Sequence, residues 1–162
     1  MHLDVRTVLV LRHPDARQVL LLRRSPDRTL FPGRVTGLGG AVELGRGEGA
    51  DLEAALWREV EEESALRPAD VAGVVLRLVT LESRGAAQVV LLWFLGQLRA
   101  VPADLSCSEG ELFFLDPAAL PAEAMIPTAR AAIDHLLALP PAAAGCRAGA
   151  FGPGAELALA PR

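Results

Sequence analysis

The sequence contains no lysine, asparagine or tyrosine and only two cysteines among its 162 residues. Since all 16 strongly basic residues are arginines, any side-chain cation that contacts a phosphate must be a guanidinium group. Cys107 and Cys146 lie far apart and lack the spacing of metal ligands. This favours isolated thiols over a disulfide and argues against a cysteine-based metal site.

Long apolar segments are missing as well. The longest, at 89–95, has the length of a strand and is followed by Gly96, so no segment is predicted to cross a membrane. Near the N-terminus, Asp4 and Arg6 interrupt the apolar run that a signal peptide needs. These two absences predict a cytoplasmic location.

An excess of positive charge is also absent, because the formal net charge is −4. The chain therefore has no basic footprint for duplex nucleic acid. A nucleotide substrate remains compatible with this charge, since one phosphate cluster needs only local positive charge. The sequence leaves the oligomeric state open.

What is present indicates one globular domain followed by a tail. Apolar residues make up 51% of the chain and charged residues 22%, which is a globular composition. Strands are predicted at 3–12, 18–24, 41–44, 74–81, 88–98 and 111–116, and helices at 51–65 and 128–139. This order predicts an α+β fold over residues 1–139, with helices packed on a mixed sheet as an α/β/α sandwich. Residues 140–162 are rich in alanine, glycine and proline and are predicted to form a poorly ordered tail.

The predicted helix at 51–65 carries acidic residues beside its apolar face. The apolar residues form one stripe along the helix, namely Leu52, Ala55, Leu56 and Val60. Glu59 and Glu63 project along the same stripe and Glu62 lies next to it, whereas Glu61 points to the opposite side. Carboxylates that converge there repel each other and resist desolvation, and a divalent cation would relieve both effects. The alternative is an acidic helix end whose glutamates bend into water.

The segment GLGGAVELGRGEGADLEAALWREVEEESAL contains this helix and the glycine-rich turn before it. It resembles the Nudix box, in which a glycine and a glutamate precede the pattern Arg-Glu-apolar-x-Glu-Glu-x-Gly-apolar. Residues 58–63 match the core of that pattern, and Gly39, Gly40, Glu43 and Gly45 resemble its approach. The glycine turn and the acidic core together make this a specific signal.

Two positions depart from the Nudix pattern. Ala65 stands where the pattern has its final glycine, so a left-handed helix cap there is expected to be strained or replaced. The stretch between Gly40 and Arg58 is also four residues longer than the pattern. The early glutamate of the pattern therefore falls on Arg46, and Glu48 is the nearest substitute.

The resemblance implies a Nudix-type α/β/α sandwich and a role for each matching residue. Glu59, Glu62 and Glu63 would bind Mg²⁺ or Mn²⁺, and any one of them could assist water activation. Gly40 would allow close backbone approach and offer a carbonyl ligand. Arg58 would orient a glutamate by a charge-assisted hydrogen bond. The implied reaction is attack of metal-activated water on a phosphorus atom of a diphosphate bond.

Two further segments resemble MutT-like enzymes, which hydrolyse oxidised purine nucleoside triphosphates. They are FPGRVTGLGGAVE and SCSEGELFFLDPAALP. In the second, Glu109 is the candidate for an additional catalytic glutamate near the metal, with Glu111 second; an ordinary polar turn is the alternative. Candidate phosphate-binding cations, independent of the resemblance, are Arg23, Arg24 and Arg34, although arginines at strand ends are commonly only solvated.

The substrate is left open among several nucleotides. The MutT-like subgroup commonly reads the base with a tryptophan and acidic residues late in the chain, where this sequence has residues 125–128 instead. Trp57 and Trp93 are expected to pack in the core. The leading interpretation is a Mg²⁺-dependent hydrolase of nucleoside triphosphates, with 8-oxo-dGTP as an example. The alternatives are a pyrophosphatase of ADP-ribose or another nucleoside-diphosphate sugar, and a non-catalytic Nudix module that senses a nucleotide. A structural domain with a solvated acidic helix is the simplest alternative.

Overall fold

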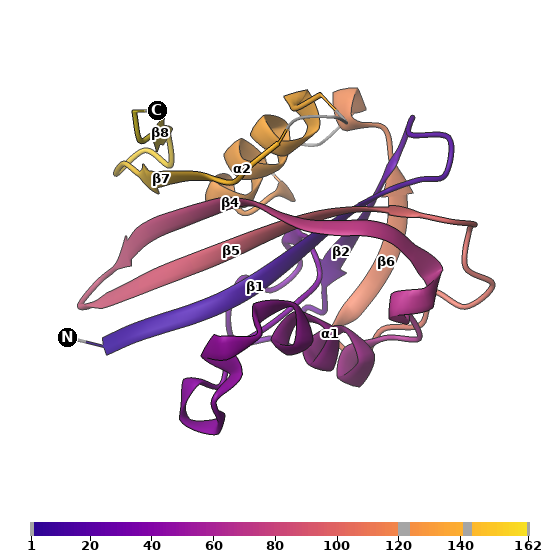
Figure 1. The fold of residues 1–162 in the computed structure, drawn as a ribbon, viewed down its shortest axis with the longest axis horizontal. Helices are drawn as coiled ribbons and strands as arrows, with labels where there is room; N and C mark the ends of the chain where they lie inside the picture. Colours follow the sequence, from indigo (N-terminus) through magenta and orange to yellow (C-terminus); the bar gives the residue numbers. More distant parts are fainter. Residues whose placement is uncertain (1, 120–123, 141–143, 162) are drawn as a thin grey trace.

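The computed structural model describes residues 2–119, 124–140 and 144–161 (Figure 1). Helix α1 (Leu52–Glu63) lies against one face of a sheet, and α2 (Pro127–Ala138) lies against the other. The strands are β1 (His2–Arg12), β2 (Val19–Arg24), β3 (Val35–Thr36), β4 (Val71–Arg84), β5 (Ala87–Leu98), β6 (Gly110–Leu115), β7 (Arg147–Phe151) and β8 (Leu157–Leu159). Short 3₁₀ turns are η1 (Leu44–Arg46), η2 (Glu48–Ala50), η3 (Pro68–Asp70) and η4 (Pro117–Ala119). This arrangement confirms the predicted α/β/α sandwich.

The sheet is mixed, as predicted. Its strand order is β3-β2-β1-β5-β4-β7-β8, and β6 pairs with β2 outside this path. Strands β1 and β5 run parallel along their whole length, from the pair His2–Ala87 to the pair Arg12–Gln97. Strands β4 and β5 form an antiparallel hairpin. The glycine turn bonds to the middle of β1, with Leu38 exchanging hydrogen bonds with Leu9 and the Gly40 carbonyl accepting from Thr7.

Both faces of the sheet are buried, so the central strands read as continuous apolar runs. In β1, Leu9 and Leu11 face the core under α1, and Val8 and Val10 face the core under α2. Trp57 packs in the first core and Trp93 in the second, as expected. Trp93 is buried because its indole N–H finds a partner, donating to Thr80 Oγ1 at 2.8 Å.

The short strand predicted at 41–44 is wrong. Ala41 makes only an isolated bridge with Arg6, and Leu44 begins the turn η1. The chain turns away from β1 here, because the Leu44 N–H donates to the Val42 carbonyl at 3.0 Å, while the Ala41 carbonyl accepts from the Arg58 side chain at 3.0 Å.

The predicted poorly ordered tail is also wrong for the described part of 140–162. Strand β7 runs parallel to β4 and pairs with it from Leu78 to Leu81, and β8 pairs antiparallel with β7. Phe151, Leu157 and Leu159 pack against the core under α2, which gives this alanine- and glycine-rich segment enough burial to hold the hairpin. The domain boundary at 139 stays a prediction. None of the helices in the described ranges is both long and apolar enough to span a membrane.

Candidate active site

Helix α1 is fixed at its start by an N-cap and along its length by the core. Asp51 caps it, since its carboxylate accepts a hydrogen bond from the Ala54 backbone N–H at 2.9 Å. Leu56 and Val60 are fully buried under the sheet. Because these residues fix the buried face of α1, Glu59 lies at the edge of that face, where its side chain is only 15% exposed.

Helix α1 ends without the left-handed glycine that the Nudix pattern has at the position of Ala65. The helix ends at Glu63, and Ser64 is extended with φ −143° and ψ 171°. Ser64 Oγ donates to the Val60 carbonyl at 2.7 Å, and the Ser108 N–H donates to the Glu63 carbonyl at 2.7 Å. The last carbonyls are thus satisfied without a left-handed residue, so Ala65 carries no strain of that kind.

The glycine turn passes between β1 and the helix. The Thr7 N–H donates to the Gly40 carbonyl at 2.9 Å, which holds the turn against β1. Gly39 has φ +125°, a conformation that favours glycine. A Cβ added to Gly40 would overlap the carboxylate of Glu59. Gly40 is therefore needed so that the backbone and the Glu59 carboxylate can lie in contact.

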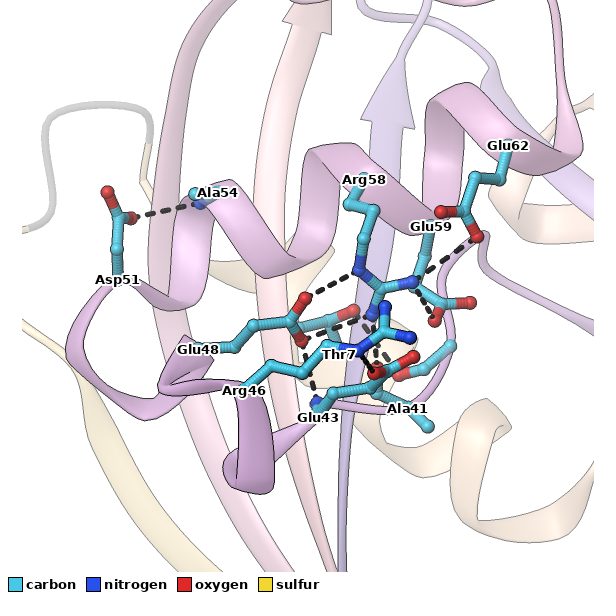
Figure 2. Close-up of polar contacts among 11 residues, drawn as sticks. Thr7, Ala41, Glu43, Arg46, Glu48, Asp51, Ala54, Arg58, Glu59 and Glu62 are labelled. Carbon is cyan, nitrogen blue, oxygen red and sulfur yellow. Dashed lines mark hydrogen bonds and ion pairs between the residues drawn. The ribbon is translucent and has the colours of Figure 1, made fainter.

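Arg58 is the centre of a polar network on α1 (Figure 2). Its Nη1 donates to Glu59 Oε1 at 2.7 Å and reaches Glu62 Oε2 at 3.3 Å. It also donates to Glu48, with Nε to Oε1 at 2.5 Å and Nη2 to Oε2 at 3.1 Å, and to the Ala41 carbonyl. The hydrogen bonds that Arg58 donates to Glu48 and then to Glu59 raise the pKa of Arg58 further above its ordinary value. Arg58 thus stays charged and sets the direction of two carboxylates.

Glu48 belongs to this polar network, although sequence reasoning left it out of the predicted site. The turns η1 and η2 fold the lengthened loop so that Glu48 faces Arg58 from outside the helix (Figure 2). Glu48 Oε2 also accepts from the Glu43 N–H at 2.6 Å. The bond from Arg58, more than the one from Glu43, lowers the pKa of Glu48. The only signal in the sequence was that Glu48 is the glutamate nearest the position taken by Arg46.

Glu63 lies at the other end of the site with an unsatisfied carboxylate. Its Oε2 is buried and has no hydrogen-bond partner among the described residues. Burial, with added repulsion from Glu109 and Glu59, raises the pKa of Glu63 from 4.5 to about 8. Glu109 is itself held by cations, with Arg28 Nη2 at 2.7 Å and Arg24 Nη2 at 4.0 Å from its Oε2. The fold therefore brings the predicted Glu109 to the carboxylates of α1.

A cleft of about 80 Å³ extends from the glycine turn towards α2. Gly39 and Gly40 line it at the turn, and Thr128 lines it at the start of α2. Arg6 and Arg24 also line it, so positive charge lies along the cleft beside the carboxylates. Arg24 is well fixed, because its Nε donates to the Leu30 carbonyl at 2.9 Å.

The domain model for the NUDIX domain matches residues 3–137 of this sequence. The chain belongs to the Nudix family. Nudix hydrolases act on nucleoside diphosphate derivatives. No curated protein matches the sequence.

Solved structures of Nudix proteins share the fold at low sequence identity. The mutator MutT protein of Bacillus halodurans has 18% identity and a TM-score of 0.61, with 95% of this chain and 94% of that chain covered. The MutT Nudix hydrolase of Burkholderia pseudomallei has 20% identity and a TM-score of 0.65, with coverage of 83% and 98%. The dihydroneopterin triphosphate pyrophosphohydrolase of E. coli has 21% identity and a TM-score of 0.60, with coverage of 85% and 98%. These similarities confirm the fold.

The donor set of the Nudix helix fits a hard divalent cation. Within the described ranges, no three His, Cys, Asp or Glu side chains are grouped as a ready-made metal site. Arg58 holds Glu59 and Glu62 by hydrogen bonds, and the charge of Glu59 acts on Glu63. The unpartnered buried oxygen of Glu63 and the contact between Glu59 and Gly40 nevertheless supply the oxygen ligands that Mg²⁺ and Mn²⁺ prefer.

The other predicted cations lie away from the cleft of this Nudix domain. Arg23 lies over the Phe113 ring at 5.1 Å and within 3.9 Å of Glu111. Neither Arg23 nor Arg34 is among the residues that line the cleft. Successive side chains on β2 point to opposite faces, so Arg24 rather than Arg23 faces the carboxylates. The predicted role of Arg23 and Arg34 in phosphate binding stays a prediction.

Proposed function

We propose that this Nudix protein is a metal-dependent hydrolase that cleaves a diphosphate bond in nucleoside triphosphates, with oxidised purine nucleotides among the candidates. The observation that carries the proposal is the convergence of Glu59, oriented by Arg58 over Gly40, with the unsatisfied carboxylate of Glu63. The name of the E. coli neighbour, a triphosphate pyrophosphohydrolase, supports a triphosphate substrate.

Glu59, Glu62, Glu63 and the Gly40 carbonyl would hold Mg²⁺ or Mn²⁺. When bound, the metal would polarise a water molecule and neutralise charge on the phosphates. The Gly40 carbonyl accepts from the Thr7 N–H at 2.9 Å and from the Thr7 hydroxyl at only 3.5 Å, so a metal would compete with this long second hydrogen bond alone.

The chain's own residues would do three things in this reaction. Arg58 fixes the rotamer of Glu59 and is itself fixed by Glu48, so the carboxylate keeps its direction. Arg24, along the cleft, would pair with phosphate oxygens. Glu109, which acts on Glu63 by charge repulsion, would accept a proton from the attacking water. Glu59, Glu62 and Glu63 are the other candidates for that proton transfer.

The test is release of phosphate and pyrophosphate from a panel of nucleoside triphosphates, oxidised purine triphosphates and nucleotide sugars, with Mg²⁺ or Mn²⁺. Glu59→Gln should abolish turnover, and Glu61→Gln is the matched control because Glu61 is exposed on the same helix. The product released identifies the bond that is cut. The proposal is wrong if no compound turns over and neither metal raises the melting temperature.

A further inference from the structure

A second cavity, of about 520 Å³, adjoins the cleft. The two cavities share four lining residues, namely Phe31, Arg84, Ile126 and Thr128. The far wall comes from the C-terminal hairpin, through Phe151 and Pro153. This hairpin lies beyond residues 3–137, which match the Nudix family. The wall therefore comes from the part of the chain that the family model does not match.

Among the described residues, Arg84 is the only cation that lines this cavity, and it is held in place from two sides. Its Nε forms an ion pair with Glu82, whose side chain is almost completely buried. Its guanidinium carbon lies 5.0 Å from the centre of the Phe31 ring. Phe31 is in turn held with φ +51°, a conformation that is unusual for a bulky residue. The surrounding structure thus fixes both members of this pair.

The free donors of Arg84 define what the cavity can recognise. Within the described ranges, its two terminal nitrogens have no hydrogen-bond partner. Two coplanar N–H groups match two adjacent acceptors, such as O6 and N7 of a 6-oxopurine, or a phosphate. Since Glu82 already neutralises Arg84, the cavity offers no net positive charge for a phosphate. Phe31 and Phe151 instead provide flat apolar surface for a ring.

We propose that this cavity binds the nucleobase of a 6-oxopurine nucleotide, with Arg84 reading its acceptor edge and the C-terminal hairpin closing the pocket. This inference rests on the proposed function, because the adjoining cleft would hold the phosphates at Gly40. The base and the phosphates would then occupy two cavities that meet at Arg84 and Phe31.

The test is binding of three compounds to the metal-free, full-length protein by isothermal titration calorimetry: guanosine monophosphate, adenosine monophosphate and ribose 5-phosphate. Adenine carries an amino group where a 6-oxopurine has its oxygen, so it cannot accept from Arg84 there. We expect the wild type to bind the guanine nucleotide about tenfold more tightly than the adenine nucleotide. Arg84→Met should remove this preference and leave the affinity for ribose 5-phosphate unchanged. Arg99→Met, an exposed arginine outside both cavities, should retain it.

A second variant tests the hairpin. Phe151→Leu keeps an apolar side chain, and we expect it to weaken both nucleotides about threefold by loss of ring stacking, with no effect on ribose 5-phosphate. Unchanged affinity in this variant, with a wild-type melting temperature, would remove the hairpin from the pocket. The base-reading role is overturned if the wild type shows no binding or no preference for guanosine monophosphate. It is also overturned if Arg84→Met loses ribose 5-phosphate equally.

These binding measurements need no hydrolysis, so the two proposals can fail separately. A base preference without turnover of any nucleotide would overturn the proposed function and leave the inference standing. Turnover of a nucleotide without a base preference would overturn this inference and leave the proposed function standing.

Discussion

Replacement of Glu63 by glutamine should change how the stability of the metal-free protein depends on pH. The folded state holds a proton on Glu63 up to about pH 8, because burial raises its pKa, whereas the unfolded chain releases this proton near 4.5. Between these values the folded state binds the additional proton, so the free energy of unfolding falls as pH rises. The stabilising contribution is complete below pH 4.5 and lost above pH 8.

The magnitude follows from the size of this pKa change. An upper limit is about 5 kcal/mol, since each pH unit corresponds to about 1.4 kcal/mol. Glu63 is only partly buried, and water screens part of its charge, so we expect about 2 kcal/mol. Glu63→Gln should therefore match the wild type near pH 5 and exceed its free energy of unfolding by about 2 kcal/mol at pH 8.

The assay is urea unfolding in chelator at intervals from pH 5 to pH 8, with Glu61→Gln as the exposed control on the same helix. Burial lowers the pKa of His135, which adds an opposite slope in the acid half of this range, but both proteins share it and the difference cancels it. Mg²⁺ at pH 8 should then raise the melting temperature of the wild type more than that of Glu63→Gln. Parallel stability profiles for wild type and variant would refute the argument.

Three other variants test the supports of the site. Glu48→Ala removes the partner that holds Arg58 and should lower kcat about 10- to 100-fold, whereas Glu43→Ala, at an exposed ion pair with Arg46, should change kcat little. Gly40→Ala should displace Glu59 and cost about 1–3 kcal/mol of stability together with most activity, whereas Gly45→Ala, with open space around it, should have little effect. Asp51→Ala removes the N-cap of α1 and should lower the free energy of unfolding by about 1 kcal/mol in urea titrations, with a substrate KM close to wild type.

The sequence by itself determined the elements that depend on local pattern. Helix α1 begins after Asp51 as predicted, because an N-cap and an apolar stripe are properties of neighbouring residues. The long strands and α2 also lie where alternation and periodicity place them. The predicted carboxylates share one side of α1 for the same reason, since helical spacing alone sets the direction of Glu59 and Glu63.

Only the tertiary structure decided contacts between residues far apart in the chain. Glu48 reaches Arg58 because two 3₁₀ turns fold the lengthened loop back on the helix, which the spacing alone did not indicate. Glu109 meets Glu63 because the loop before β6 bonds to the helix end. Strand register, which local pattern does not reveal, places Arg24 rather than Arg23 in the cleft.

The C-terminal segment is the clearest case of structure that the sequence pattern did not predict. Its alanine, glycine and proline content predicted a tail, because such residues bury little apolar surface by themselves. Strand β4 supplies the missing partner, since it offers unpaired backbone groups with which β7 forms a parallel ladder. A ladder of this kind depends on the backbone of a distant strand, so composition could not predict it and only the assembled sheet decided it.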